Sequence, residues 1–140
     1  MEYLHSDITG QILKAFYDVY NELGYGFLER VYKNALYKEL KKRSFDCSTE
    51  QSIPVYYQGE IVGDYFADII VNNMIILELK AVKTILPEHE TQLMNYLRAT
   101  DAEVGLLLNF GPNPQQRRII FTNDKKKKIA NHLNTKYINK

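Results

Sequence analysis

The stretch Phe66-Ala67-Asp68-Ile69-Ile70-Val71-Asn72-Asn73-Met74-Ile75-Ile76-Leu77-Glu78-Leu79-Lys80 predicts two neighbouring β-strands. Branched apolar residues dominate both halves, as is typical of strands that pack on a pleated surface. The paired asparagines between the halves predict a tight turn, because Asn tolerates positive φ. The second half belongs to the most apolar strand of the chain, so we expect it in the middle of a sheet.

Two charged residues interrupt the second strand. Glu78 and Lys80 are two positions apart, so their side chains point to the same face of the strand. A charge buried among apolar neighbours is costly unless it is paired or binds a metal. Two interpretations follow: Glu78 and Lys80 form an internal ion pair at the strand end, or they belong to a cation-binding site.

Whether Asp68, on the first strand, lies opposite Glu78 depends on the length of the turn. A three-residue turn places Asp68 opposite Glu78, with β-carbons about 5 Å apart, whereas a two-residue turn places it opposite Leu77. In the first register the two carboxylates repel each other, and a divalent cation would relieve the repulsion. Oxygen ligands favour Mg²⁺ or Mn²⁺ over zinc. A lysine beside a metal-bound water can orient it, stabilise negative charge or take up a proton. A metal, two acids and a lysine together indicate phosphodiester hydrolysis.

The rest of the chain predicts an α/β domain. Apolar spacings of three and four residues predict helices over 8–23 and 28–43, and a third helix begins at Pro87. Strands are expected over residues 51–57, 61–71, 74–82, 104–109 and 117–121, with a short basic helix in the tail. The resulting order is α-α-β-β-β-α-β-β-α, and we expect a mixed sheet of about five strands flanked by helices.

Length and composition indicate a single globular domain over residues 1–140, with its core over about 7–121 and a basic tail over 124–140. The 140 residues are 45% hydrophobic and carry a net charge of +1. No stretch approaches the length of a membrane span, and the lone Cys47 and the first residues fit a cytoplasmic protein. The overall charge is that of neither a strongly basic nor a strongly acidic protein, although Lys125 to Lys128 concentrate positive charge locally.

Two motifs carry a resemblance to known families. Asp68 followed by Glu78-Leu79-Lys80 resembles the PD-(D/E)XK nuclease superfamily. Gly26-Phe27-Leu28-Glu29-Arg30-Val31-Tyr32 matches Gly-x-x-Glu-x-x-Tyr, the motif of the GxxExxY protein family. The chain is similar to that family over about residues 7–121, and the similarity continues through residues 54–57, 67–68, 77–82, 89–93, 95–97 and 105–110.

The resemblance implies a restriction-endonuclease-like core and assigns a role to each residue of the motifs. Asp68 and Glu78 would ligate Mg²⁺ (or Mn²⁺), together with the backbone carbonyl of Leu79. Lys80 would act on the attacking water, and Glu29 would be a supporting acid. Gln92, on the helix after the Glu-x-Lys strand, would hold water or phosphate.

The residues outside the metal triad also have structural interpretations. For Glu29 the structural interpretation is the third position of a helix capped at Gly26, where an acid is favoured by the helix dipole and can accept from the cap amide. Tyr32 either packs in the core or hydrogen-bonds Glu29, one helical turn away. Gln92 could equally be a surface amide, and we expect His89 to be structural.

These observations lead to two functional hypotheses. The first is a Mg²⁺-dependent nuclease acting on nucleic acid, with DNA favoured over RNA. The alternative is a catalytically silent module that keeps the nuclease fold and binds nucleic acid or a protein partner. A homodimer, or a partner subunit that supplies a basic surface, is compatible with either hypothesis.

Overall fold

Nine elements follow one another in the computed structural model, which describes residues 4–130 and the side chains as far as residue 126. Their order confirms the predicted α-α-β-β-β-α-β-β-α succession and the α/β class. The elements are α1 (Ser6–Leu23), α2 (Glu29–Lys42), β1 (Cys47–Tyr57), β2 (Glu60–Val71), β3 (Ile75–Lys80), α3 (Pro87–Arg98), β4 (Val104–Phe110), β5 (Pro114–Ile120) and α4 (Asn123–Ala130).

The five strands form one mixed sheet in the order β1-β2-β3-β4-β5. Strand β3 is central, as its apolar sequence predicts, and its partners β2 and β4 are antiparallel and parallel to it, respectively. Helix α3 makes the crossover that a parallel connection needs. The two edges are β1 and β5, and the edge position of β1 accommodates Pro54, which has no N–H to donate.

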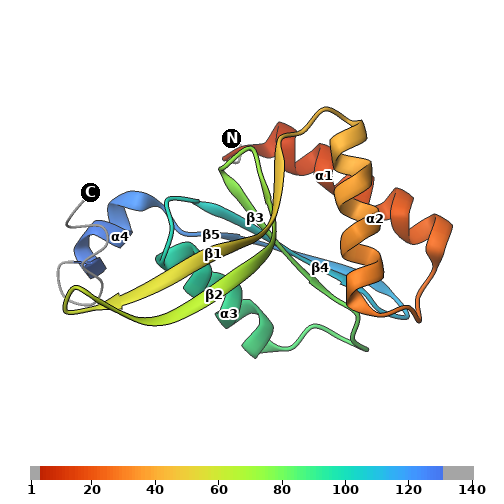
Figure 1. The fold of residues 1–140 in the computed structure, drawn as a ribbon. Helices are drawn as coiled ribbons and strands as arrows, with labels where there is room; N and C mark the ends of the chain where they lie inside the picture. The colour runs from red at the N-terminus through yellow and green to blue at the C-terminus, as the bar shows by residue number, and fades with distance from the viewer. Residues whose placement is uncertain (1–3, 131–140) are drawn as a thin grey trace.

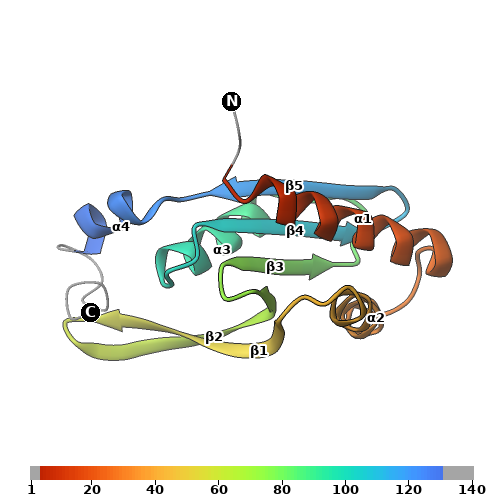
Figure 2. The same ribbon diagram turned by 90° about the horizontal axis from the view of Figure 1, so that it is seen from above.

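The sheet separates two layers of helices, as Figures 1 and 2 show: α1 and α2 cover one face and α3 covers the other. Each layer has its own core. The first packs Ile12, Phe16 and Leu36 of the helices against Leu77 and Leu79 of β3 and against β4. The second packs Leu93, Tyr96 and Leu97 of α3 against Ile70, Ile76 and Leu107. This is the restriction-endonuclease-like arrangement that the sequence predicts.

Some predicted boundaries differ from the structure. The strand predicted over 74–82 ends at Lys80, and the strand predicted over 117–121 runs from Pro114 to Ile120. The pairing between β4 and β5 begins with Phe110 opposite Pro114. Because β4 offers a partner there, β5 includes polar residues that show no strand pattern of their own. None of the helices within residues 4–130 combines the length and apolarity that crossing a bilayer requires.

The hairpin of β1 and β2 extends past the rest of the sheet. Its tip and the α1–α2 connection lie at opposite ends of the molecule (Figures 1 and 2). Its outer part is two-stranded, because β2 pairs with β3 only over Ile69–Val71. Residues 44–79, which include this hairpin, contain six acidic residues and no Lys or Arg. All 18 Lys and Arg therefore lie elsewhere in the chain, together with 11 of the 17 acidic residues.

Candidate functional site

The turn between β2 and β3 has the three residues that bring the two acids together. Val71 pairs with Ile75, so Asn72, Asn73 and Met74 form the turn. Both asparagines adopt left-handed backbone angles, with φ of 53° and 54°. Asn tolerates this region better than branched residues do. The three-residue register is thereby confirmed.

Beyond the short β2–β3 ladder, side chains replace the backbone pairing. The ladder ends where Ile69 faces Leu77. One residue further on, the backbone N–H of Asp68 donates to Glu78 Oε1 at 3.1 Å. In return, the backbone N–H of Leu79 donates to Asp68 Oδ2 at 2.8 Å. Each carboxylate thus holds the opposite strand, and the two acids lie side by side.

Asp68 lies where strand β2 changes the face that its residues present. Ala67 packs in the α3 layer, whereas Ile69, two residues later, packs in the layer of α1 and α2. Regular alternation would put both on one face. Glu50 of β1 lies opposite this point, between the pairs that join Gln51 to Ala67 and Thr49 to Ile69. Its φ of 55° is left-handed, so the irregularity affects both strands.

The two carboxylates destabilise each other's charged form. Glu78 is only 6% exposed. Burial, and then the negative charge of Asp68, raise the pKa of Glu78 to about 8. Burial also raises the pKa of Asp68, although the hydrogen bond from Leu79 and the nearby Lys33 oppose that rise. A cation bound between the two groups would favour their charged forms and so oppose both shifts.

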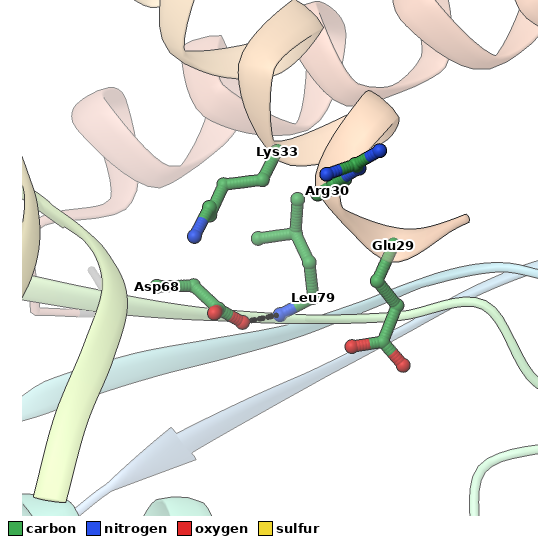
Figure 3. A pocket seen from close by; sticks show the side chains of 5 residues that line it. All are labelled: Glu29, Arg30, Lys33, Asp68 and Leu79. Atoms are coloured by element: carbon green, nitrogen blue, oxygen red, sulfur yellow. Dashed lines mark hydrogen bonds between the residues drawn. The ribbon is translucent and has the colours of Figure 1, made fainter. Parts of the chain in front are cut away.

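A pocket of about 180 Å³ opens beside Asp68 on the α2 side of the sheet, lined by Glu29, Arg30, Lys33, Asp68 and Leu79 (Figure 3). Glu29 and Lys33 extend from α2 toward the strands, and Lys33 points toward Asp68. Lys33 also forms an ion pair with Glu50. Two cationic side chains therefore accompany the acids in this pocket, which the sequence motifs alone do not indicate.

Glu29 is the first residue of α2, and the residue that precedes the helix is Leu28. The interpretation that Gly26 caps this helix, with Glu29 as its third residue, is therefore wrong. Glu29 is exposed and lines the pocket with Asp68. The first-turn position still gives it a favourable interaction with the helix dipole.

Lys80 and Gln92 lie toward the other layer. Ile76 packs against α3, so Glu78 and Lys80, two and four positions later, point to that side of the sheet. The positive charge of Lys80 partly offsets the rise in the pKa of Glu78. Gln92 of α3 donates from Nε2 to the Tyr96 hydroxyl at 2.7 Å.

Tyr96 of α3 lies near Glu78, and the sequence motifs do not indicate this. Burial, and then the Glu78 carboxylate, raise the pKa of its hydroxyl. Gln92 is therefore hydrogen-bonded to a residue whose pKa is raised by the Glu78 charge. Helical spacing can indicate that Tyr96 faces the core, but it cannot show that its hydroxyl lies near a carboxylate.

A buried amide fixes the chain just after Lys80. Asn109 is fully buried and pairs with Lys80 in the parallel ladder. Its side chain accepts from the Val82 N–H and donates to the Val82 carbonyl, each at 2.9 Å. A β-carbon at Gly111 would lie 2.0 Å from that carbonyl, so only glycine fits there. These contacts set where the backbone goes as it leaves the Glu-x-Lys segment.

Two further residues of the motifs have structural contacts. Tyr32 is fully buried and stacks on Phe110 with ring centroids 4.4 Å apart, and its hydroxyl bonds to the backbone of Gly24 and Phe27 rather than to Glu29. The packing interpretation is confirmed. His89 accepts from the Leu86 N–H at 3.0 Å through Nδ1, which agrees with the expected structural role at the start of α3.

The donor set around Asp68 and Glu78 fits a hard divalent cation. Each carboxylate accepts the backbone N–H of the opposite strand with one oxygen and has a second oxygen to offer. Within residues 4–130, no three His, Cys, Asp or Glu side chains converge as a ligand group. Further ligands would therefore be backbone carbonyls or water, and Mg²⁺ commonly retains several waters in protein sites.

Comparison with known proteins agrees with this arrangement. A model of the PD-(D/E)XK nuclease superfamily matches residues 6–119. The chain belongs to the PD-(D/E)XK nuclease superfamily. Nucleases of this superfamily generally use divalent metal ions and act on nucleic acid.

Among solved structures, the crystal structure of SSO0001 is similar to this chain, with a TM-score of 0.56 and 21% sequence identity. The similarity covers 74% of this chain and 59% of the SSO0001 chain. At this identity it shows the fold alone. Comparison with curated proteins yields no match.

Proposed function

We propose that this protein is a Mg²⁺-dependent nuclease of the GxxExxY group that hydrolyses phosphodiester bonds, in DNA rather than RNA. The observation that carries the proposal is the reciprocal bonding of Asp68 and Glu78 across the end of the β2–β3 ladder. This bonding brings together two carboxylates whose pKa values are raised, next to the lysine of the Glu-x-Lys sequence. The chain that carries them belongs to the PD-(D/E)XK nuclease superfamily.

Each residue then has a definite task. Asp68, Glu78 and the Leu79 carbonyl would hold Mg²⁺, which when bound would supply Lewis-acid polarisation of the phosphoryl group. Lys80 would orient the attacking water and stabilise negative charge on the phosphoryl group, while Glu29 would assist from the pocket on the α2 side. Gln92 would hold water or phosphate on the α3 side, where its hydrogen bond to the Tyr96 hydroxyl positions its amide.

The direct test is cleavage of supercoiled plasmid, single-stranded and branched DNA by the purified chain, with Mg²⁺ and with EDTA. Lys80→Ala and Glu78→Gln should each lower the rate by about 100-fold or more, as loss of a proton-transfer or metal-holding group does. Lys83→Ala is the matched control, because Lys83 is an exposed lysine three residues further on. Cleavage that persists in both site variants would refute the assignment.

One observation favours the alternative, a silent module that binds without hydrolysis. Each acid already holds a backbone N–H of the opposite strand, so the pair also has a purely structural use. In that case nucleic acid binds equally well in EDTA, and no cleaved product forms at any Mg²⁺ concentration. A nuclease that needs a partner subunit would instead gain activity when it is copurified from its native source.

A further inference from the structure

The loop between α1 and α2 presents apolar side chains to solvent directly beside the candidate site. Tyr25, Phe27 and Leu28 are 63%, 49% and 68% exposed. The next two residues, Glu29 and Arg30, line the pocket that contains Asp68. Large apolar side chains exposed next to one another in a segment that leads into a polar pocket indicate an interaction site.

A buried tyrosine holds this loop in one conformation. The Tyr32 hydroxyl donates to the Gly24 carbonyl at 2.7 Å and accepts from the Phe27 N–H at 3.2 Å. Gly24 and Gly26 have φ of 67° and 114°, a region in which other residues are strained. Tyr32 itself is anchored by stacking on Phe110. The exposed rings are therefore presented by a fixed backbone, which lowers the entropy cost of binding.

Charge restricts what can bind next to these rings. Arg30 and Lys33 follow on α2 and line the same pocket, as Figure 3 shows. The β1–β2 hairpin, at the opposite end of the molecule from the loop (Figures 1 and 2), lies in the segment without Lys or Arg. The α2 side of the pocket therefore offers a phosphate two cationic side chains beside the acids Glu29 and Asp68, whereas the hairpin itself has none to offer.

We propose that the loop formed by residues 25–28 is a stacking platform for bases, so that the substrate has unpaired bases next to the phosphate to be cleaved. This inference rests on the proposed function and narrows its substrate to single-stranded or frayed nucleic acid. Aromatic rings with neighbouring cationic side chains recognise such strands, because every base has a face that can stack and paired bases in a duplex do not expose theirs.

The test measures binding separately from cleavage. Fluorescence anisotropy in EDTA compares a labelled single-stranded DNA oligonucleotide with the same oligonucleotide in a duplex. Phe27→Ala and Tyr25→Ala should each weaken single-strand binding roughly 5- to 100-fold and duplex binding less than about twofold. Phe66→Ala is the matched control, since Phe66 is 51% exposed on the acidic hairpin. Phe27→Trp should retain the affinity, and circular dichroism verifies that each variant is folded.

The results separate failure of this inference from failure of the proposed function. Equal weakening by Phe66→Ala, equal effects on single strand and duplex, or no single-strand binding by the unaltered protein would each overturn the platform. Metal-dependent cleavage that is indifferent to Phe27→Ala overturns the platform but leaves the nuclease intact. Phe27-dependent binding of single strands without cleavage in Mg²⁺ supports the platform and contradicts the nuclease.

Discussion

Replacing Glu78 by glutamine should stabilise the metal-free protein at alkaline pH. The amide keeps the shape of the side chain and can still accept the hydrogen bond from the Asp68 N–H. It removes a buried negative charge that lies beside a second one. If the charge of Glu78 were compensated in the folded protein, the same change would be neutral or destabilising.

The sign and size of the effect follow from the pKa of Glu78. Burial and Asp68 raise it from 4.5 to about 8, so the folded protein retains a proton that the unfolded chain has lost. Stability is therefore greatest below pH 4.5 and falls as the pH rises through about 8. At about 1.4 kcal/mol per pH unit, the upper limit is roughly 5 kcal/mol, and relaxation of the site reduces the expected gain of the variant to about 1–3 kcal/mol.

Urea denaturation followed by far-ultraviolet circular dichroism, in EDTA at pH 5 and pH 8.5, measures this difference. The unaltered protein should lose stability between the two values, and the Glu78→Gln variant should lose much less. Glu60→Gln, at an exposed position of the hairpin, is the control and should follow the unaltered protein. The reasoning fails if Glu78→Gln is less stable than the unaltered protein at pH 8.5, or if both have the same pH dependence.

Three further changes have predictable outcomes. Mg²⁺ should raise the thermal midpoint of the unaltered protein at pH 8, because it binds only the folded carboxylate pair, and Asp68→Asn should abolish that rise in calorimetry. Deletion of Asn73 shortens the turn to two residues and turns Asp68 away from Glu78, so the Mg²⁺ effect should vanish even if circular dichroism still reports a folded sheet. Asn109→Ala leaves the Val82 N–H and carbonyl without their partner and should cost about 1–3 kcal/mol in urea denaturation, whereas an unchanged midpoint would show that water replaces the amide.

The fold was largely accessible from the sequence, since the order of elements depends on apolar periodicity and turn residues. The centre of the sheet is a clear example: β3 is so apolar that only a central position suits it, and the paired asparagines define the turn before it. The boundaries were less accessible. Strand β5 starts at Pro114 because β4 offers it a partner, and pairing of this kind depends on tertiary contacts rather than on local residue preference.

The candidate site was accessible only in part. Spacing predicted that Asp68 and Glu78 could meet, but two registers were open until the turn was known. Nothing in the sequence indicates the change of face at Asp68. It accompanies a left-handed conformation of Glu50, which is disfavoured for a glutamate. Lys33 and Tyr96 reach the acids from helices on opposite layers, and contacts of that kind depend on how the layers pack.

The outer part of the β1–β2 hairpin carries Glu60 and Asp64 as its only charged residues, and the basic helix α4 lies at the same end of the molecule (Figures 1 and 2). With a net charge of only +1, the molecule as a whole exerts little long-range pull on a polyanion. Positive charge is instead available to a polyanion at separate places, on α4 and on Arg30 and Lys33 beside the pocket. Association should then depend on these local groups and become slower as the ionic strength rises, because salt screens each of them.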